Sequence, residues 1–311
     1  MEMRTIGSLT VSLVGIGCNN FGGRIDQAAT QAVVDAALDA GINLFDTADI
    51  YGGGRSEELL CVALGSRRDD VVIATKFGMG DGTSLPAGAG AASVTAAVEG
   101  SLRRLGTDRI DLYQLHAPDT STPLDETLGA LDRLVRDGKV LEIGCSNFNG
   151  TLVDDAAASA GANGTARFVS VQNELSLLRR RGEADLLAAC ARHDLVFLPY
   201  FPLASGMLTG KYRRGAEPPE GTRLAGLSPE RRESALSDRR FDTVEALDRF
   251  ARERGRSLLE LSMSWLAGLP GLASVIAGAT RPEQVHANAG AVGWTLDADD
   301  RRELDAISAP G

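Results

Sequence analysis

The chain has 311 residues and a net charge of −10, and 43% of its residues are hydrophobic. This length suits one large α/β barrel or two ordinary domains, with enough apolar residues for a large core. The acidic balance argues against nucleic acid or an anionic membrane surface as the main partner. The sequence has neither an apolar run of about 18 residues nor a secretory signal pattern, so we expect a cytoplasmic protein.

The numbers and positions of cysteine and lysine indicate which kinds of site to expect. The four cysteines stand alone at positions 18, 61, 145 and 190. Because none forms a C-x-x-C pair, we expect buried free thiols and neither a metal site nor a redox dithiol. Only three of the 32 basic residues are lysines, namely Lys76, Lys139 and Lys211. Because the chain otherwise uses arginine, each lysine suggests a position where a compact ammonium group is needed.

The predicted elements begin with a small hairpin over residues 4–12, where a Gly-Ser turn separates two short strands. Apolar runs then alternate with stretches of helical spacing. The strand-like runs are 13–17, 42–46, 71–75, 110–115, 140–144, 168–172, 195–199 and 273–277. The helix-like runs are 28–40, 56–65, 91–105, 124–137, 151–161, 183–193, 241–254 and 282–290, with additions near 257–267 and 297–308.

Turn and cap residues fit these boundaries. Ser56 before two glutamates predicts a helix start, and Gly41, Gly106 and Gly138 predict helix ends. The regular spacing breaks once, over 204–240, which carries Gly, Pro and Arg and has no clear strand. A long segment after the seventh strand predicts a loop over the active-site face of a barrel.

Alternating strands and helices predict parallel strands joined by right-handed crossovers. Eight such units in one chain favour an α/β fold with an eight-stranded parallel β/α (TIM) barrel, an N-terminal β-hairpin and extra helices, as a single domain over 1–311. The alternative is a doubly wound Rossmann sheet. Its glycine signature fails here, because residues 15–20 read G-I-G-C-N-N and lack the third glycine.

Four polar residues follow three consecutive strands and are expected at one barrel mouth. Asp46 and Tyr51 follow the second strand, Lys76 ends the third, and His116 follows the fourth. A carbonyl that accepts a hydride also needs a proton, and tyrosine becomes a useful donor when an ammonium lowers its pKa. The carboxylate would hold the lysine, and the imidazole would orient the carbonyl oxygen.

Each of these residues also has an ordinary structural explanation: a loop cap, a rim aromatic, a strand-end lysine or a structural histidine. The convergence of all four on one face favours a functional site. The other two histidines, His193 and His286, lie in helical stretches and are expected to be structural or surface residues.

Other strand ends offer partners for a dinucleotide. Tyr200 can stack on a flat ring, and Ser146, Asn147 and Gln172 can bind a carboxamide. The segment 202–206 with Lys211, and Gly278, Thr280 and Arg281 at the last barrel helix, can hold phosphates. The alternative for the second segment is an ordinary helix start with Pro282 in the first turn. Phe21, Phe77 and Phe148 either line an apolar substrate pocket or belong to the core.

Several strings along nearly the whole chain resemble the aldo-keto reductase superfamily. They are FDTADIYG (45–52), SEELL (56–60), IATKFG (73–78), RIDLYQLH (109–116), GKVLEIGCSNF (138–148), VQNELSLL (171–178), PLASGMLTGKY (202–212) and GATRPEQVHAN (278–288). The sequence looks most similar to bacterial reductases that resemble potassium-channel β-subunits.

This resemblance implies a catalytic tetrad in which Tyr51 donates the proton, Lys76 adjusts its pKa, Asp46 pairs with Lys76, and His116 orients the substrate. It also implies a set of residues that contact the cofactor. They are Gly17, Asn19, Asp46, Ser146, Asn147, Gln172, Tyr200, Phe201, Pro202, Leu203, Ser205, Gly206, Lys211, Gly278, Thr280, Arg281, Gln284 and Asn288.

The cofactor preference rests on fewer residues. Many members place Lys and Arg around the adenosine 2′-phosphate, where this chain has Gly278 and Gln284, leaving Thr280 and Arg281. Ala287 also replaces the acidic residue that often precedes the final asparagine. The resemblance implies NADP(H), and NAD(H) stays open.

The expected activity is NADPH-dependent reduction of an aldehyde or ketone, with a small carbonyl or alcohol as substrate and neither nucleic acid nor a membrane as partner; the oligomeric state stays open. The alternatives are a sugar, alcohol or pyridoxal dehydrogenase, a deoxysugar ketoreductase, and a cofactor-sensing regulatory subunit. The intact tetrad favours an enzyme.

Overall fold

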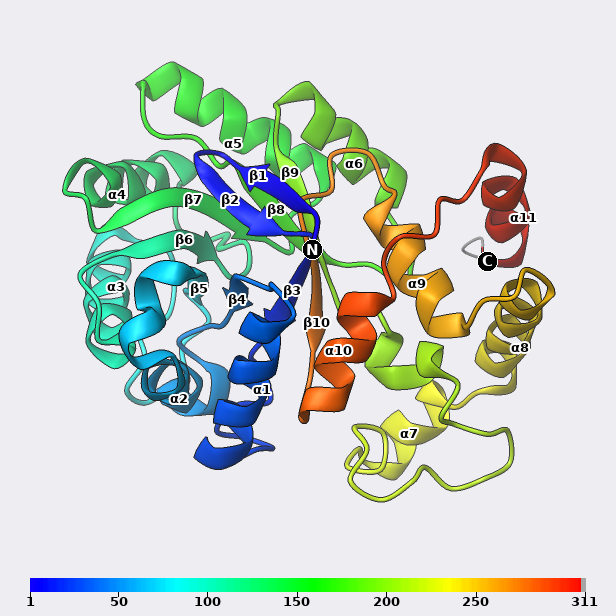
Figure 1. Cartoon of the computed structure of the whole chain (residues 1–311). Coiled ribbons are helices and arrows are strands. Elements are labelled where there is room, and N and C mark those ends of the chain that lie inside the picture. Colours follow the sequence, from blue (N-terminus) through cyan, green and yellow to red (C-terminus); the bar gives the residue numbers. More distant parts are fainter. Residues whose placement is uncertain (309–311) are drawn as a thin grey trace.

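Eight parallel strands close into a barrel in the computed structural model, which describes residues 1–308 (Figure 1). They follow one another around the barrel in chain order, and β10 lies between β9 and β3. On β10, Ile276 pairs with Gly15 on one side and with Tyr200 on the other, which closes the ring. The strands are β3 (Val14–Gly17), β4 (Leu44–Asp46), β5 (Val72–Phe77), β6 (Ile110–Leu115), β7 (Val140–Ser146), β8 (Ser170–Glu174), β9 (Val196–Tyr200) and β10 (Val275–Gly278). The predicted eight-stranded barrel is confirmed.

Helices surround the barrel and bury their apolar faces against the outer side chains of the strands. In α4, for example, Leu128, Leu131 and Leu134 recur at helical spacing and are buried. The helices between barrel strands or after the last one are α1 (Gln27–Asp39), α2 (Arg55–Leu64), α3 (Ala91–Leu105), α4 (Leu124–Arg136), α5 (Gly150–Asn163), α6 (Glu183–Arg192), α8 (Asp238–Glu253), α9 (Leu258–Ala267), α10 (Pro282–Gly290) and α11 (Ala298–Ser308). Every predicted helix is present.

One predicted helix start is wrong. Ser56 does not cap α2, because the helix begins at Arg55 after a left-handed Gly54. The Ser56 hydroxyl is buried instead, where it contacts the Thr47 hydroxyl at 2.8 Å and donates to the Cys18 carbonyl at 2.9 Å. It thus fastens the first turn of α2 to the ends of two barrel strands. The predicted helix ends at Gly41, Gly106 and Gly138 all have the positive φ expected of them.

The predicted hairpin is also present, as strands β1 (Met3–Ile6) and β2 (Leu9–Ser12), and it covers the N-terminal end of the barrel (Figure 1). Its Ile6, Leu9 and Val11 pack against side chains that point into the barrel, such as Leu44 and Leu112. The barrel interior is therefore filled at this end, and polar side chains inside it gather at the opposite end.

Residues 204–240, expected to form a loop, contain more regular structure than predicted. A 3-10 helix, η3 (Ala204–Thr209), opens the segment, and α7 (Pro229–Ala235) and the first turn of α8 close it. Ser228 caps α7 and Pro229 occupies its first turn, a helix start signal that the sequence offers. In the middle, Arg223 donates to the side chains of Asn19 and Asn20, so the segment reaches the C-terminal end of β3.

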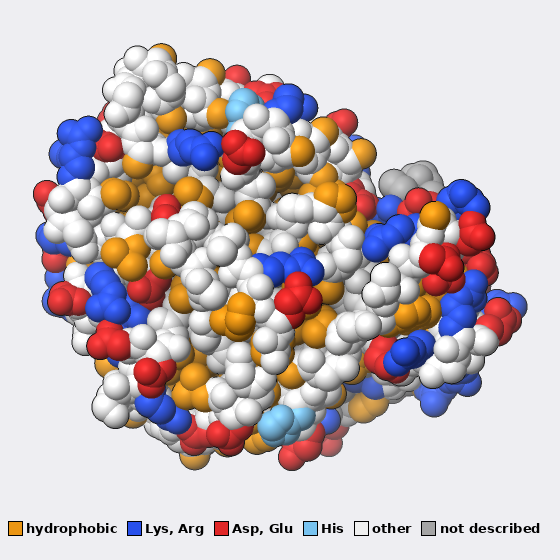
Figure 2. All heavy atoms as spheres, turned by 45° about the horizontal axis from the view of Figure 1, so that its top comes forward, with side chains coloured by type: hydrophobic (Ala, Val, Ile, Leu, Met, Phe, Trp, Pro, Cys, Tyr) orange, Lys and Arg blue, Asp and Glu red, His pale blue; other side chains and the backbone are white. Residues whose placement is uncertain are grey.

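The surface at the hairpin end shows acidic and basic side chains interspersed, with neither sign gathered in one place (Figure 2). Within residues 1–308, no helix combines the length and apolar character needed to cross a membrane. Cys18, Cys145 and Cys190 are buried free thiols, as expected, whereas Cys61 is half-buried.

Candidate active site

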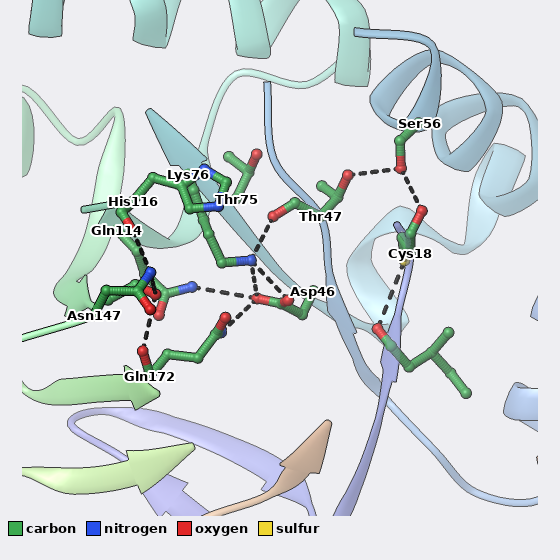
Figure 3. A network of polar contacts seen from close by, with 12 residues as sticks. Cys18, Asp46, Thr47, Ser56, Thr75, Lys76, Gln114, His116, Asn147 and Gln172 are labelled. Atoms are coloured by element: carbon green, nitrogen blue, oxygen red, sulfur yellow. Dashed lines mark hydrogen bonds and ion pairs between the residues drawn. The ribbon is translucent and has the colours of Figure 1, made fainter. Parts of the chain in front are cut away.

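A buried ion pair lies at the C-terminal end of the barrel (Figure 3). Lys76 projects inward from β5 and donates to both carboxylate oxygens of Asp46, at 2.8 and 2.7 Å. It also donates to the Thr47 carbonyl at 2.9 Å. Burial lowers the pKa of Lys76, but attraction to Asp46 and Tyr51 outweighs it and raises the pKa above its ordinary value. Lys76 is therefore a charged ammonium at neutral pH.

Two glutamine amides complete the surroundings of Asp46. Gln172 donates to Asp46 Oδ1 at 2.7 Å from β8, and Gln114 does so at 3.3 Å from β6 (Figure 3). One carboxylate thus joins β4, β5, β6 and β8. Since a buried charge needs compensation, these contacts hold both Asp46 and the Lys76 ammonium in one geometry.

Tyr51 and His116 lie beside this pair. The Lys76 ammonium is 5.2 Å from the centre of the Tyr51 ring, and the rings of Tyr51 and His116 meet edge to face at 5.8 Å. Burial raises the pKa of Tyr51, and Lys76 only partly offsets it, so the net pKa lies above the ordinary value. This direction is opposite to the expected lowering. The phenol is therefore protonated at neutral pH.

His116 is an uncharged imidazole. Burial, followed by repulsion from Lys76, lowers its pKa to about 3. Within the described part of the chain, its buried Nδ1 has no hydrogen-bond partner. A neutral imidazole beside a protonated phenol can orient a carbonyl oxygen by hydrogen bonding without bringing a second positive charge.

The predicted carboxamide-binding side chains form a network that leads away from the tetrad. The Ser146 hydroxyl donates to the Gln172 carbonyl at 2.8 Å. The Asn147 amide donates to the His116 carbonyl at 2.8 Å and accepts from the Tyr200 hydroxyl at 2.8 Å. These contacts fix Tyr200, which is half-buried at the end of β9, at the edge of the same mouth.

The backbone after β9 has an unusual conformation. Phe201, Ala204 and Ser205 have φ angles of 52°, 46° and 59°, which are rare for residues other than glycine. Gly206, at φ 93°, has a backbone conformation that other residues rarely adopt, and an added Cβ would also displace the end of the Lys211 side chain. Such strain persists where the surroundings enforce it, often at functional sites. Pro202 and Leu203 complete this turn.

Four cations gather around this turn. Lys211 is exposed at its surface, yet partial burial together with Arg24, Arg281 and Arg223 lowers its pKa. Arg223 lies with its guanidinium 4.9 Å from the centre of the Phe201 ring and donates to Asn19 at 3.2 Å. Every charged group that shifts the Lys211 pKa is itself a cation, so the cluster fits a polyanionic ligand.

The last predicted segment lies beside this cluster, at the start of α10. The Thr280 backbone and hydroxyl both donate to the Gln284 side chain, at 2.8 and 3.1 Å. Arg281 is mostly exposed, and its nearest acid is Glu283 at 3.6 Å. Gly278 pairs with Gly17 in the barrel, and Asn288 is buried within α10.

The three phenylalanines proposed for a substrate pocket are core residues. Phe21, Phe77 and Phe148 are at most 1% exposed. Phe77 stacks on Tyr113 at 4.7 Å, and Phe148 meets Phe168 edge to face at 5.9 Å. They point outward from the barrel toward the helices and present no surface to a ligand, which favours the core alternative.

Gln114, Arg24 and Arg223 belong to the site but are not predicted from the sequence. Gln114 lies inside a strand and not beyond its end, although strand alternation places it on the same side as Leu112, which faces the barrel interior. Arg24 and Arg223 lie in loops, where no periodicity indicates direction. An excess of arginine in the segment after the seventh strand is the signal that would have pointed to Arg223.

Comparison with known proteins agrees with this arrangement. Residues 13–309 match the Aldo/keto reductase family. The chain is 33% identical over 317 residues to "Aldo-keto reductase YhdN" of Bacillus subtilis, covering 99% of this chain and 93% of that protein. It is 32% identical over 295 residues to a "Probable voltage-gated potassium channel subunit beta" of Oryza sativa, covering 93% and 90%.

A third relative is named for a carbonyl substrate. The chain is 39% identical over 212 residues to "Aflatoxin B1 aldehyde reductase member 2" of Rattus norvegicus, covering 66% of this chain and 57% of that protein. Together, the match over nearly the whole chain, the confirmed barrel and the convergence of four chemically matched side chains at its mouth identify this protein as a member of the aldo/keto reductase family, an oxidoreductase that acts on carbonyl or alcohol groups.

Proposed function

We propose that this protein uses NADPH to reduce an aldehyde or ketone to an alcohol, with Tyr51 supplying the proton. The observation that carries the proposal is a protonated phenol held between a charged ammonium and an uncharged imidazole at the barrel mouth. These three groups match the needs of a carbonyl oxygen that gains negative charge.

Each residue of the tetrad has a distinct task in this scheme. Tyr51 transfers its proton to the carbonyl oxygen, and the nearby Lys76 ammonium stabilises the phenolate that remains. Asp46 keeps Lys76 charged and fixed in place. His116 donates a hydrogen bond that orients the carbonyl oxygen before the proton moves.

The cofactor site fits a nicotinamide dinucleotide with an additional phosphate. When bound, the reduced nicotinamide would supply the hydride. Tyr200 offers a flat surface for the ring, and Ser146, Asn147 and Gln172 offer amide and hydroxyl groups around it. Lys211, Arg24, Arg223 and Arg281 supply more positive charge than one pyrophosphate needs. This excess favours NADP(H) over NAD(H), with Arg281 and Thr280 at the 2′-phosphate.

The raised pKa of Tyr51 also favours the direction of reduction. An alcohol dehydrogenase needs the phenolate as a base, whereas the protonated phenol is the acid that reduction consumes. A cofactor-sensing role, suggested by the names of some relatives, would not require this protonation state.

The test combines turnover with binding. NADPH oxidation is followed at 340 nm with 4-nitrobenzaldehyde, and cofactor binding is followed by fluorescence titration. Tyr51→Phe is expected to bind NADPH normally and to lose about 10²–10⁴-fold in turnover, the usual contribution of a general acid. Arg281→Ala is expected to weaken NADPH more than NADH. If neither dinucleotide binds, the proposal is wrong, and tighter binding of NADH would refute the cofactor assignment alone.

A further inference from the structure

A second buried acid lies close to the tetrad and has no role in the mechanism above. Asp49 lies between Asp46 and Tyr51 in the sequence, and its side chain is fully buried. In residues 1–308, neither of its carboxyl oxygens has a hydrogen-bond partner. Its backbone N–H donates to the Lys76 carbonyl at 3.1 Å, which ties this segment to β5. An ionised carboxylate without partners in a buried place costs much free energy, so the charge state of Asp49 needs an explanation.

The polar groups around Asp49 come from two barrel strands, β5 and β6, and from the two helices α2 and α3 that cover them. Strand alternation directs Lys76 inward and its neighbour Thr75 outward (Figure 3). Outside the barrel, Thr75 donates to Glu57 on α2 at 2.6 Å. Arg104 on α3 pairs with Glu57 at 2.7 Å. The Tyr113 hydroxyl on β6 is buried and has no hydrogen-bond partner among the described residues. Burial raises the pKa of Tyr113, and a negative charge on Asp49 would raise it further.

The cluster around Asp49 contains two acids, Asp49 and Glu57, and one cation, Arg104. Glu57 is fully buried and holds Arg104. The ammonium of Lys76, on the other side of the strand, is already bonded to both oxygens of Asp46 and to the Thr47 carbonyl. Arg104 and Lys76 each pair with another acid and favour the Asp49 charge only from a distance, so burial and Glu57 outweigh them. An uncharged carboxylic acid is therefore the form compatible with the burial of Asp49.

The segment that carries Asp49 and Tyr51 ends in three consecutive glycines, here called the glycine joint. Gly52, Gly53 and Gly54 all have positive φ angles, of 60°, 64° and 94°. A Cβ at Gly54 would lie 2.8 Å from the Arg104 side chain, so the cation of the cluster also packs against the end of this joint. Three consecutive left-handed glycines resist movement less than any other residues would.

We propose that Asp49 is a positioning residue: its uncharged carboxyl group keeps the Tyr51 segment packed against β5 and β6, and loss of its proton drives this segment toward solvent and withdraws Tyr51 from the tetrad. The inference rests on the proposed function, because it concerns the presentation of the proton donor. The step itself is a simple ionisation in which the proton passes to water.

The site's other groups titrate elsewhere, which makes the idea testable. Burial, followed by repulsion from Glu57, raises the pKa of Asp49 to about 7. The pKa of His116 lies near 3, and those of Tyr51 and Lys76 lie above their ordinary values near 10. Among these groups, Asp49 alone changes charge near neutrality.

The experiment measures kcat/KM for 4-nitrobenzaldehyde from pH 5.5 to 8.5 at saturating NADPH. The wild type is expected to lose about tenfold between pH 6 and pH 8, as one ionisation near pH 7 dictates. Asp49→Asn, which is close in shape and always neutral, is expected to abolish this fall. Asp108→Asn makes the same change at a position whose side chain is 93% exposed and is expected to retain it. Ionisation of the cofactor phosphate affects the wild type and both variants alike, so it cannot produce a difference between them.

A second variant and a second readout cover the remaining outcomes. Glu57→Gln leaves Arg104 available to Asp49 and is expected to move the fall in activity to lower pH, which a purely structural role would not do. Melting temperatures report without turnover: Asp49→Asn is expected to gain stability over the wild type as the pH rises. A fall that persists unchanged in Asp49→Asn, or a melting difference that does not vary with pH, overturns the proposal. Absence of turnover with any carbonyl, beside a pH-dependent melting difference, overturns only the proposed function.

Discussion

The Asp46–Lys76 pair predicts a large coupling energy between two substitutions. Asp46→Asn leaves the Lys76 ammonium, which is 1% exposed, with neutral acceptors only, the new amide oxygen and the Thr47 carbonyl, so the buried positive charge loses its counter-charge. Lys76→Met leaves the Asp46 carboxylate with the two glutamine amides at 2.7 and 3.3 Å. Breaking a buried ion pair by removing one partner costs about 3–5 kcal/mol. The loss is expected at the lower end for Lys76→Met, because the two amides still compensate the carboxylate.

The double variant, Asp46→Asn with Lys76→Met, removes both charges and leaves neither uncompensated. Its cost is expected to resemble that of one single variant, which gives a coupling of about 3 kcal/mol. The pKa of Lys76 is raised in the folded state. Its contribution to the free energy of unfolding is therefore fully present at pH 7 and is lost only as the pH rises through that raised pKa.

Urea unfolding at pH 7, followed by far-UV circular dichroism, measures the four free energies of the cycle. Lys139→Met and Glu99→Gln form a matched control cycle, because this ion pair is about 40% exposed on both sides. A much smaller coupling than that of the buried pair is expected for it, because solvent screens exposed charges. Additive losses at Asp46 and Lys76, within about 0.5 kcal/mol, would refute the view that a buried charge pair organises the site.

Three further outcomes are expected. The proton resonances of His116 should show no titration above pH 4, unlike those of an ordinary histidine. Because its pKa falls from 6.5 to about 3 on folding, acidification from pH 6.5 to 3 should cost on the order of 3–5 kcal/mol, and His116→Gln should remove that slope in acid unfolding. Gly206→Ala should lose about 1–3 kcal/mol and weaken NADPH binding, measured by fluorescence, whereas Gly215→Ala, also at positive φ but with open space around it, should change stability alone. Arg104→Met should cost about 3–5 kcal/mol in urea unfolding by stranding Glu57, and a similar loss for the exposed Arg103→Met would contradict this reasoning.

Local patterns predict much of this fold because barrel units repeat. The strands of the barrel coincide with short apolar runs and its helices with stretches of helical spacing, and glycine marks the ends of α1, α3 and α4. The tetrad follows from one geometric rule, that side chains after parallel strands meet at one end. The expectation that 1–311 forms a single domain stays a prediction.

The remainder depends on tertiary contacts that no local pattern encodes. Ser56 has the sequence signature of a cap but bonds to Thr47 and Cys18, since closure of the barrel brings a carbonyl within its reach. The direction of the Tyr51 pKa depends on how much burial opposes a nearby charge, a balance that spacing cannot reveal. Likewise, the phenylalanines follow strand ends as a pocket would require, yet their backbone turns them toward the helices.

The hairpin at the closed end of the barrel has a consequence for synthesis of the chain. It is synthesised well before its partners at and just before β10: Arg4 donates to the Leu272 carbonyl at 2.9 Å across 268 residues, and Ala273 and Ile276 belong to the same hydrophobic cluster as the hairpin. Ile6, Leu9 and Val11 therefore stay without their full packing until nearly the entire chain is available. The hairpin therefore reaches its native packing only after β10 has joined the barrel, and until then its apolar side chains are open to non-native contacts.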